Sequence, residues 1–495
     1  MDLYYQSTRD SSLRVTASQA VLQGLAPDGG LFVPGKIPEL GVELPRLASM
    51  TYQETALAVM KQFLTDYTEE ELKDCIRKAY DDKFDTEAVA PLAKAGGLYY
   101  LELFHGPTIA FKDMALSILP HLMTRAAEKN HLDKEIVILT ATSGDTGKAA
   151  MAGFADVPGT RIIVFYPRDG VSQVQKLQMV TQKGANVDVV AVTGNFDDAQ
   201  SGVKALFRDK DLAAEMAAAG RQFSSANSIN IGRLVPQIVY YVYAYGRLLE
   251  NEEIQAGDKI NIVVPTGNFG NILAAYYAKQ MGLPIDRLIC ASNDNKVLFD
   301  FFRTGVYDRN RQFLLTISPS MDILISSNLE RLLYEITGRD DEETRRRMEE
   351  LRDVGRYEIS GEMREGLHDF RAGYATEEET CAQIRKVWEK TSYLIDPHTA
   401  VASKVCEEIR TEEDLEGACV VASTASPYKF VKSVLSAVDG HYKDREELDL
   451  IPELEKVSGV EMPRAIREIL TESPRHRLEC APAEMKETVR RILGI

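Results

Sequence analysis

The 495-residue sequence lacks any long hydrophobic run, and no stretch approaches the ~18 apolar residues that a membrane-spanning helix needs. It also lacks an excess of basic residues, because 58 Lys and Arg stand against 75 Asp and Glu and give a net charge of −17. This balance argues against nucleic acid and against an anionic membrane as the main partner. An anionic substrate would therefore need a local basic pocket.

Cysteine is scarce, and the six cysteines form no CxxC pair. No group of histidine, cysteine and acidic residues has the spacing of metal ligands either. The first residues contain neither the basic nor the apolar segment of a signal peptide. We therefore expect reduced thiols, no metal site and a cytoplasmic protein.

Short β-branched strands alternate with helical patterns through much of the chain. The strands are expected over residues 135–142, 161–166, 186–192, 259–264 and 417–422. Continuous apolar strands of this kind predict an α/β fold with a mostly parallel sheet buried on both faces. The mixed-sign run at residues 340–355 instead predicts a solvated surface helix.

Lys112 lies in the run His-Gly-Pro-Thr-Ile-Ala-Phe-Lys-Asp at residues 105–113. Thr108 is a candidate N-cap, which would place Lys112 near a helix N-terminus, and Pro120 should kink or end that helix. The helix dipole there disfavours an ammonium ion, and a free amine can form a Schiff base with an aldehyde cofactor. Taken alone, such a lysine is more often a solvated residue on an amphipathic helix.

Three strand-to-helix turns further along the chain carry polar groups. The Gly-Asn-Phe-Gly-Asn turn at residues 267–271 would bring backbone N–H groups close to a phosphate. The Ser-Gly-Asp-Thr-Gly turn at residues 143–147 suits a carboxylate, and the Ser-Thr-Ala-Ser-Pro turn at residues 423–427 could offer a hydroxyl to a ring nitrogen. Each turn alone is also explained by helix capping or by packing.

Two better-known phosphate motifs are excluded. Gly267 and Gly270 do not have the spacing of a dinucleotide-binding GxGxxG motif. A P-loop ending at Gly147 would need glycine in place of Thr142 and Ser or Thr in place of Ala149. The lysine and the three turns together instead match pyridoxal 5′-phosphate, which has one aldehyde, one phosphate and one ring nitrogen.

The chain resembles the threonine synthase family nearly end to end, in its longer branch with an extra N-terminal domain. The motifs that carry the resemblance lie at residues 24–34, 105–113, 140–147, 194–198, 227–233, 265–271 and 318–323. The resemblance implies a fold type II pyridoxal enzyme of the tryptophan synthase β family, with two open, mostly parallel αβα domains. The expected domains are N-terminal (1–95), small (135–224) and large (96–134 and 225–495), with a charged helical insertion at about 310–390.

The resemblance also implies a function and a set of site residues. The substrate would be O-phospho-L-homoserine, which with water gives L-threonine and phosphate, and the resemblance to the longer branch suggests a monomer. Lys112 would bind the cofactor covalently and act as the base, and Thr424 would face the ring nitrogen. The residues expected around the cofactor phosphate are Gly267, Asn268, Phe269, Gly270 and Asn271. Those expected around the substrate are Ser143, Asp145 and Thr146 for its carboxylate or amine, and Ser228, Asn230 and Arg233 for its phosphate.

The chain departs from the family pattern at three positions. Ser426 stands where the family usually has histidine, Ile231 replaces a usual tryptophan, and Lys148 replaces a small residue. Lys148 would be either an extra phosphate contact or a solvated helix lysine, and Arg233 could equally be a surface arginine. His105 and His398 are each more often turn residues than ligands.

Two other functions remain open. A pyridoxal-dependent phospholyase would share the cofactor residues and release 2-oxobutyrate. A non-catalytic homologue would bind an amino acid or phosphate without turnover, although the intact Lys112 argues against it.

Overall fold

Two open sheets organise the protein, whose structure is a computed structural model that describes residues 3–142, 144–169 and 171–495. The larger sheet has the strand order β14-β11-β10-β15-β5-β4 and is parallel except at β4, which runs antiparallel to β5. Its strands are β4 (Leu92–Ala95), β5 (Leu98–Glu102), β10 (Ile260–Pro265), β11 (Ile285–Ser292), β14 (Phe370–Tyr374) and β15 (Ala418–Ser423). Helix α17 (Pro397–Glu412) contacts β10, β11, β14 and β15, while α11 (Gly270–Gln280) contacts β10 and β11, beside α10 (Ile231–Glu250).

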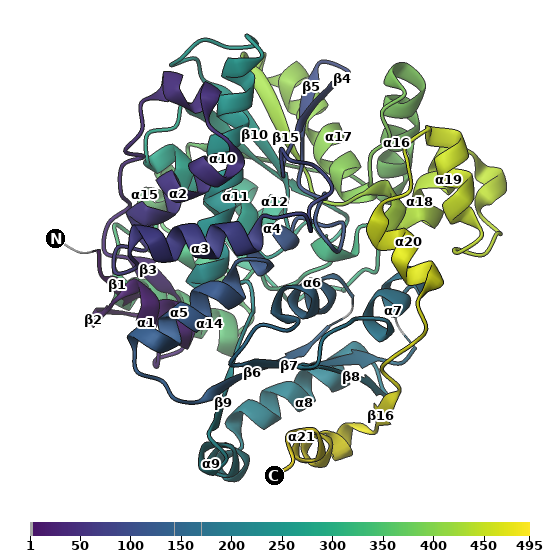
Figure 1. Ribbon diagram of the computed structural model, residues 1–495. Helices are drawn as coiled ribbons and strands as arrows, with labels where there is room; N and C mark the ends of the chain where they lie inside the picture. The colour runs from purple at the N-terminus through teal and green to yellow at the C-terminus, as the bar shows by residue number, and fades with distance from the viewer. Residues whose placement is uncertain (1–2, 143, 170) are drawn as a thin grey trace.

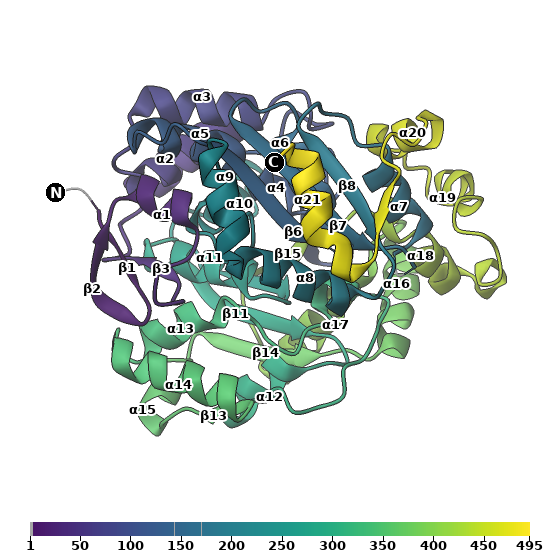
Figure 2. The same cartoon turned by 90° about the horizontal axis from the view of Figure 1, so that it is seen from below.

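The smaller sheet is entirely parallel, with the order β16-β8-β7-β6-β9. Its strands are β6 (Glu135–Ala141), β7 (Thr160–Pro167), β8 (Val187–Val192), β9 (Arg221–Ser224) and β16 (Leu478–Cys480). Helices α8 (Phe196–Arg208), α9 (Lys210–Ala218) and α21 (Met485–Leu493) cover its outer face (Figure 2). Helices α6 (Asp145–Phe154) and α7 (Gln173–Val180) lie on the inner face, towards the rest of the molecule (Figure 1).

The C-terminal segment departs from the expected grouping of residues 225–495 with the large domain. Leu478 to Cys480 pair with β8, so this segment completes the smaller sheet. A three-residue strand has no pattern that specifies which sheet it joins, because its partner lies almost 300 residues away in the chain. β4 likewise falls inside the expected N-terminal domain, yet it pairs with β5 in the larger sheet.

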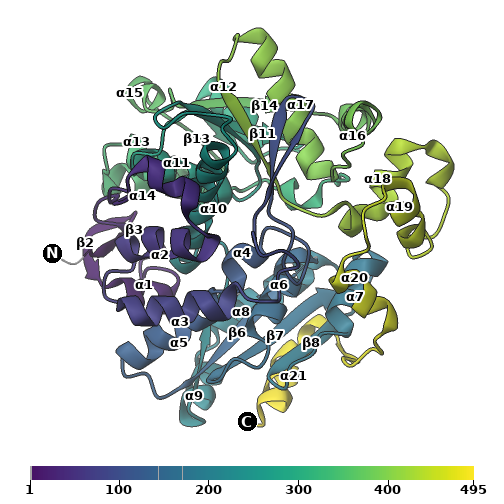
Figure 3. The ribbon, with the colours of Figure 1, turned by 45° about the horizontal axis from the view of Figure 1, so that its top comes forward.

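The N-terminal region packs against α10 and α5 (Leu119–Lys129). It contains β1 (Tyr5–Ser7), β2 (Asp10–Val15), α1 (Ala17–Gln23), β3 (Phe32–Pro34), η1 (Leu44–Ser49), α2 (Tyr52–Phe63) and α3 (Glu69–Ala79). The three strands form an antiparallel sheet in the order β2-β1-β3 (Figure 2), and Figure 3 shows β2 and β3 close to α1. Helices α1, α2 and α3 each begin with a threonine capping box, which explains where they start.

The remaining elements connect these layers. They are α4 (Asp113–Leu116), α12 (Val297–Thr304), β12 (Val306–Asp308), η2 (Pro319–Met321), α13 (Leu329–Ile336), α14 (Asp341–Asp353), β13 (Arg356–Glu358), α15 (Gly361–Glu365), α16 (Glu377–Thr391), η3 (Pro427–Phe430), α18 (Val431–Val438), η4 (Gly440–Tyr442), α19 (Leu450–Ser458), α20 (Arg464–Thr471) and η5 (Pro482–Glu484). The helix after Lys112 is interrupted between Leu116 and Leu119, as Pro120 predicted, and Pro120 lies in the first turn of α5, where a proline costs no hydrogen bond.

The sequence predicted the α/β class and all five of the strands that it named, although β5, β11 and β14 of the larger sheet were not expected. The charge-rich region at 310–390 contains the surface helix α14, as predicted, but it also supplies β14 to the larger sheet. Within the described residues, no helix combines the length and the apolar character that a membrane crossing requires.

Candidate active site

Lys112 immediately precedes the single-turn helix α4. The predicted N-cap role of Thr108 is wrong, because its N–H and hydroxyl donate to the Asp113 carboxylate at 2.8 and 2.6 Å instead. The loop folds back on itself through Ile109, whose φ is 51°, so Thr108 faces the carboxylate and not the helix end. The helix start beside Lys112 was nevertheless predicted correctly.

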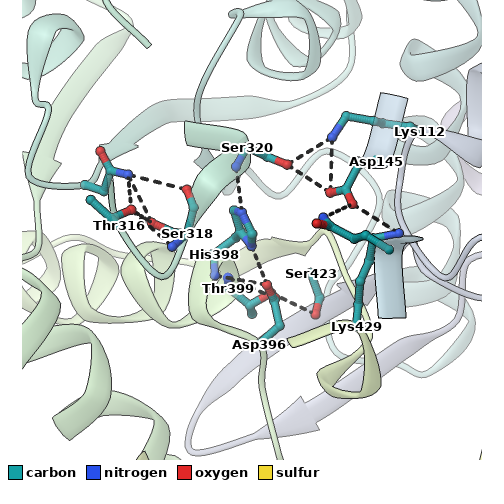
Figure 4. A network of polar contacts seen from close by, with 12 residues as sticks. Lys112, Asp145, Thr316, Ser318, Ser320, Asp396, His398, Thr399, Ser423 and Lys429 are labelled. Atoms are coloured by element: carbon teal, nitrogen blue, oxygen red, sulfur yellow. Dashed lines mark hydrogen bonds and ion pairs between the residues drawn. The ribbon is translucent and has the colours of Figure 1, made fainter. Parts of the chain in front are cut away.

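The Lys112 side chain is 11% exposed, and its amine faces two polar side chains (Figure 4). Its Nζ donates to the Ser320 hydroxyl at 3.0 Å and lies 3.5 Å from Asp145 Oδ2. Burial lowers the pKa of Lys112; Asp145 opposes that shift, and the positive charges of Lys429 and Arg233 add to it. The lowered pKa expected from a helix dipole therefore has burial as its main cause.

Asp145 is the first residue of α6. Its carboxylate accepts from Ser320 Oγ and Gln175 Nε2, both at 3.1 Å, and pairs with Lys429 Nζ at 3.1 Å. Burial alone would raise the pKa of Asp145, but Lys429 and Lys112 hold it well below its usual range. An ionised carboxylate repels a substrate carboxylate, so its contacts suit an amine.

The neighbouring positions of that turn contribute less to the geometry. Thr146 is half-buried at the start of α6, and Ser143 lies outside the described residues. The Thr142 hydroxyl accepts from the N–H groups of Gly144 and Gly147, each at 3.0 Å, and so satisfies an N–H in the first turn of α6. This contact closes the turn tightly enough that Gly147 could not carry a side chain, since an added Cβ would lie 2.3 Å from the Thr142 methyl group.

The turn at residues 267–271 joins β10 to α11 and has the shape of an anion site. Phe269 adopts a left-handed conformation with φ of 65° at the start of α11. The carbonyls of Gly267 and Asn268 accept from Ser326 Oγ at 2.7 Å and Asn328 Nδ2 at 3.0 Å. The N–H groups of residues 267–270 donate to no acceptor among the described residues. Free N–H groups at a helix start favour a phosphate.

The Asn271 side chain stabilises the turn at residues 267–271, because its amide donates to the Pro265 carbonyl at 3.2 Å. Ser320 links this turn to Lys112. Its hydroxyl contacts the amine, and its carbonyl approaches Gly267 so closely that an added Cβ there would lie 2.4 Å away. A single residue, Ser320, therefore lies between the reactive amine and the anion-binding turn.

Arg233 is buried near the N-terminus of α10 and is only 3% exposed, so the surface-arginine alternative is wrong. Its guanidinium donates to the Ala226 carbonyl at 3.1 Å, and its Nε has no partner among the described residues. Burial lowers the pKa of Arg233 to about 10. A buried guanidinium with a free donor is suited to an anion.

Asn230 has no amide hydrogen left for a substrate phosphate, contrary to expectation. Its Nδ2 donates to the carbonyls of Val21 at 2.9 Å and Ser225 at 3.4 Å, and its Oδ1 caps α10 through Gly232 N–H at 2.8 Å. The sequence could not reveal this, because Val21 belongs to the N-terminal helix α1. Ser228 is half-buried in the loop before α10.

The turn after β15 contains Thr424 and Ser426. Thr424 is buried, and its carbonyl accepts from Phe111 N–H at 2.8 Å, which ties this turn to the Lys112 loop. Ser426 caps η3 by accepting from Tyr428 N–H at 3.3 Å, so the capping interpretation is confirmed. Lys148 is not solvated: it is buried against Gln182, and burial lowers its pKa to about 7.

Sequence reasoning missed the residues that complete this polar network. Lys429 has a fully buried side chain that donates to the Thr108 carbonyl at 3.0 Å and to Gln178 at 3.3 Å. Ser320 lies in a stretch that carried the family resemblance, but that stretch suggested no role for it. His398 was interpreted as a turn residue, although it is buried and its imidazole faces Ser320.

Family comparison identifies the class of protein that this site defines. Residues 85–425 match the family described as "Pyridoxal-phosphate dependent enzyme". The chain belongs to that class, its cofactor is pyridoxal phosphate, and the free N–H groups at 267–270 and the buried amine of Lys112 fit that cofactor. Residues 4–80 match "Threonine synthase N terminus", and the chain belongs to the threonine synthase family.

Three relatives illustrate the similarity. "Threonine synthase" of Saccharomyces cerevisiae is 36% identical over 92% of this chain and 93% of its own length. A PLP-bound threonine synthase from Brucella melitensis has a TM-score of 0.87 and 36% identity, and 99% of each chain is covered. "Threonine synthase-like 1" of Macaca fascicularis is 40% identical over 87% of this chain, which spans only 59% of that relative's length.

Proposed function

We propose that this chain converts O-phospho-L-homoserine and water to L-threonine and phosphate, by β,γ-elimination followed by addition of water at Cβ. The observation that carries the proposal is the Lys112 amine, whose pKa is lowered by burial and which is separated by Ser320 alone from the free N–H groups at 267–270. The family membership supports the choice of reaction.

The cofactor, when bound, supplies the electron sink that makes the carbons next to the amino group acidic. Lys112 is the proposed covalent attachment point and, once released, the base that takes and returns protons at Cα and Cβ. Burial keeps a larger fraction of this amine unprotonated than in water, which is the form that can accept a proton.

The other residues are assigned by the charges that they offer. The N–H groups of residues 267–270 would hold the cofactor phosphate, and Thr424 would offer a neutral hydroxyl to the ring nitrogen. Asp145, ionised beside Lys112, would attract the substrate amino group, with Thr146 next to it. Arg233 is the proposed anchor for the substrate phosphate, with Ser228 as a candidate second contact.

The product distinguishes this function from the phospholyase alternative. The holoenzyme is incubated with O-phospho-L-homoserine, and phosphate, threonine and 2-oxobutyrate are quantified in parallel. We expect threonine and phosphate in equal amounts. A predominance of 2-oxobutyrate would reject the synthase, and the absence of any product together with tight binding would identify a non-catalytic protein.

A further inference from the structure

Ser320 touches the reactive amine, its carboxylate partner and the anion-binding turn at once. It lies in the short helix η2 (Pro319–Met321), where its Oγ accepts from Lys112 Nζ at 3.0 Å and donates to Asp145 Oδ2 at 3.1 Å (Figure 4). Because the Ser320 hydroxyl donates its single hydrogen to Asp145 in a hydrogen bond, its oxygen can only accept from Lys112. An N–H of Lys112 must then point at Ser320, which leaves the lone pair of the neutral amine free for chemistry.

The backbone of Ser320 is held by a buried imidazole. Its N–H donates to His398 Nε2 at 3.1 Å, and His398 Nδ1 lies 2.6 Å from Asp396 Oδ2. Since a backbone N–H can only donate, Nε2 must be the acceptor, and the ring proton is on Nδ1 and directed at Asp396. These two contacts define a single tautomer for the His398 ring.

The Asp396–His398 pair is itself rigidly placed at the start of α17. Asp396 is completely buried and also accepts from the N–H groups of His398 and Thr399 at 3.0 and 3.1 Å. The imidazole packs on the ring of Phe430, with 4.9 Å between centroids. Asp396 contacts this imidazole directly, and Asp145 interacts with it at longer range. Every contact of His398 thus fixes the direction in which Nε2 points.

Met321 anchors the segment that carries Ser320 in the hydrophobic core, but the residues before Ser320 have little apolar packing. Leu315, five residues earlier, is 84% exposed, and Phe313 and Leu314 are exposed as well. Hydrogen bonds fix the segment instead: Asp322 accepts from Asn293 Nδ2 at 2.7 Å and from Thr316 N–H at 2.9 Å. The part of the segment before Met321 is held largely by hydrogen bonds, so the loss of one of them allows that part to move. His398 supplies the bond nearest to the reactive amine.

We propose that Ser320 is a further catalytic residue, in contact with the reacting amine, and that His398 and Asp396 are positioning residues that hold its hydroxyl between Lys112 and Asp145. This inference rests on the proposed function only in taking Lys112 as the reactive lysine. It assigns to the buried histidine a role that acts entirely through the Ser320 backbone.

The test compares four variants of the holoenzyme. Ser320→Ala removes the hydroxyl, His398→Leu removes the acceptor at Nε2, and His398→Gln keeps an acceptor oxygen near that position. The double variant Ser320→Ala/His398→Leu measures whether the two residues act together. Controls are His368→Leu and Ser49→Ala, which change residues that are exposed and lie outside the site.

Two readouts are expected to move together. In turnover, Ser320→Ala and His398→Leu lower kcat by roughly tenfold to a hundredfold with little change in KM, as expected for a misplaced catalytic group. Without substrate, the pH midpoint of the lysine-bound cofactor absorbance shifts in the same direction in both, by about half a pH unit or more. His398→Gln stays close to the parent, and the double variant is no worse than Ser320→Ala alone.

Three outcomes would overturn the proposal: an unchanged midpoint in His398→Leu, effects that multiply in the double variant, or no effect of Ser320→Ala. Thermal unfolding of each variant shows whether a loss of activity comes from general destabilisation. If His398→Leu is destabilised, the proposal is decided by comparing kcat and the pH midpoint of His398→Gln with those of Ser320→Ala. Because the absorbance titration needs no substrate, it tests this inference even if the product is not threonine.

Discussion

Lys429 and Asp145 form a buried ion pair, with 3.1 Å between Nζ and Oδ1, although one comes from η3 and the other from the start of α6. Asp145 belongs to the smaller sheet's layer, and Lys429 follows a strand of the larger sheet. The pair therefore joins the two halves of the molecule beside Lys112. It keeps Asp145 ionised and places a second positive charge near the reactive amine.

Replacing Lys429 by methionine should destabilise the protein and raise the pKa of both Asp145 and Lys112. The first effect follows because Asp145 loses a buried cation, which costs about 3 kcal/mol of unfolding free energy. The second follows because Lys112 loses a like-charged neighbour. Urea denaturation measures the first effect. Lys432→Met, at an exposed position of α18, is the control and should change stability by less than about 0.5 kcal/mol. Equal losses in both variants would contradict the buried-pair argument.

Lys112→Ala should abolish both turnover and the covalent attachment of the cofactor, because among the described residues only the Lys112 amine is hydrogen-bonded to Ser320. Borohydride treatment of the holoenzyme followed by peptide mass spectrometry measures the attachment. The pyridoxyl group is expected on the Lys112 peptide of the parent and of Lys176→Ala, an exposed control on α7. A pyridoxyl adduct on any other lysine of the parent would contradict the assignment of Lys112 as the residue that binds the cofactor.

Gly267→Ala should weaken cofactor binding. An added Cβ would lie 2.4 Å from the Ser320 carbonyl, so either the turn or the Ser320 segment must move. We expect the dissociation constant for pyridoxal phosphate to rise at least tenfold, with a loss of kcat because Ser320 is displaced. Gly361→Ala, whose added Cβ meets nothing within 4 Å, should leave both quantities unchanged. Normal cofactor affinity in Gly267→Ala would mean that the turn can relax without cost.

His105 should make stability depend on pH. Burial by itself would lower its pKa, but hydrogen bonds from its ring to Asp85 and Glu102, at 2.6 and 2.8 Å, raise the pKa to about 9. A pKa raised above the unfolded value of 6.5 stabilises the protein fully below that pH, and the contribution disappears as the pH rises through 9.

The comparison of the parent with His105→Gln measures this contribution. The difference in unfolding free energy should be largest at about pH 6 and should shrink towards pH 9.5. His441→Gln, at an exposed position, serves as the control and should show a smaller trend. A difference that stays constant with pH would show that the two carboxylates do not bind a charged imidazole.

The parts of the fold that depend on local pattern could be predicted from sequence. The strands from β6 to β8 are continuous β-branched runs, so their type and limits follow from periodicity. The cap at Ser426 also follows from neighbouring residues alone. β14 and β16 could not be predicted, because they are short strands whose assignment depends on a partner far away in the chain.

The sequence by itself determined the α/β class, the lysine loop and the glycine turn, since each of them depends on residues that are close together in the chain. Only the tertiary structure decided which groups surround the amine. Lys429, Ser320 and His398 come from separate elements and form one polar network around Lys112, because the two sheets pack together there. Burial, which changes the pKa of Lys112 and Arg233, is likewise a property of the packed molecule and not of any segment.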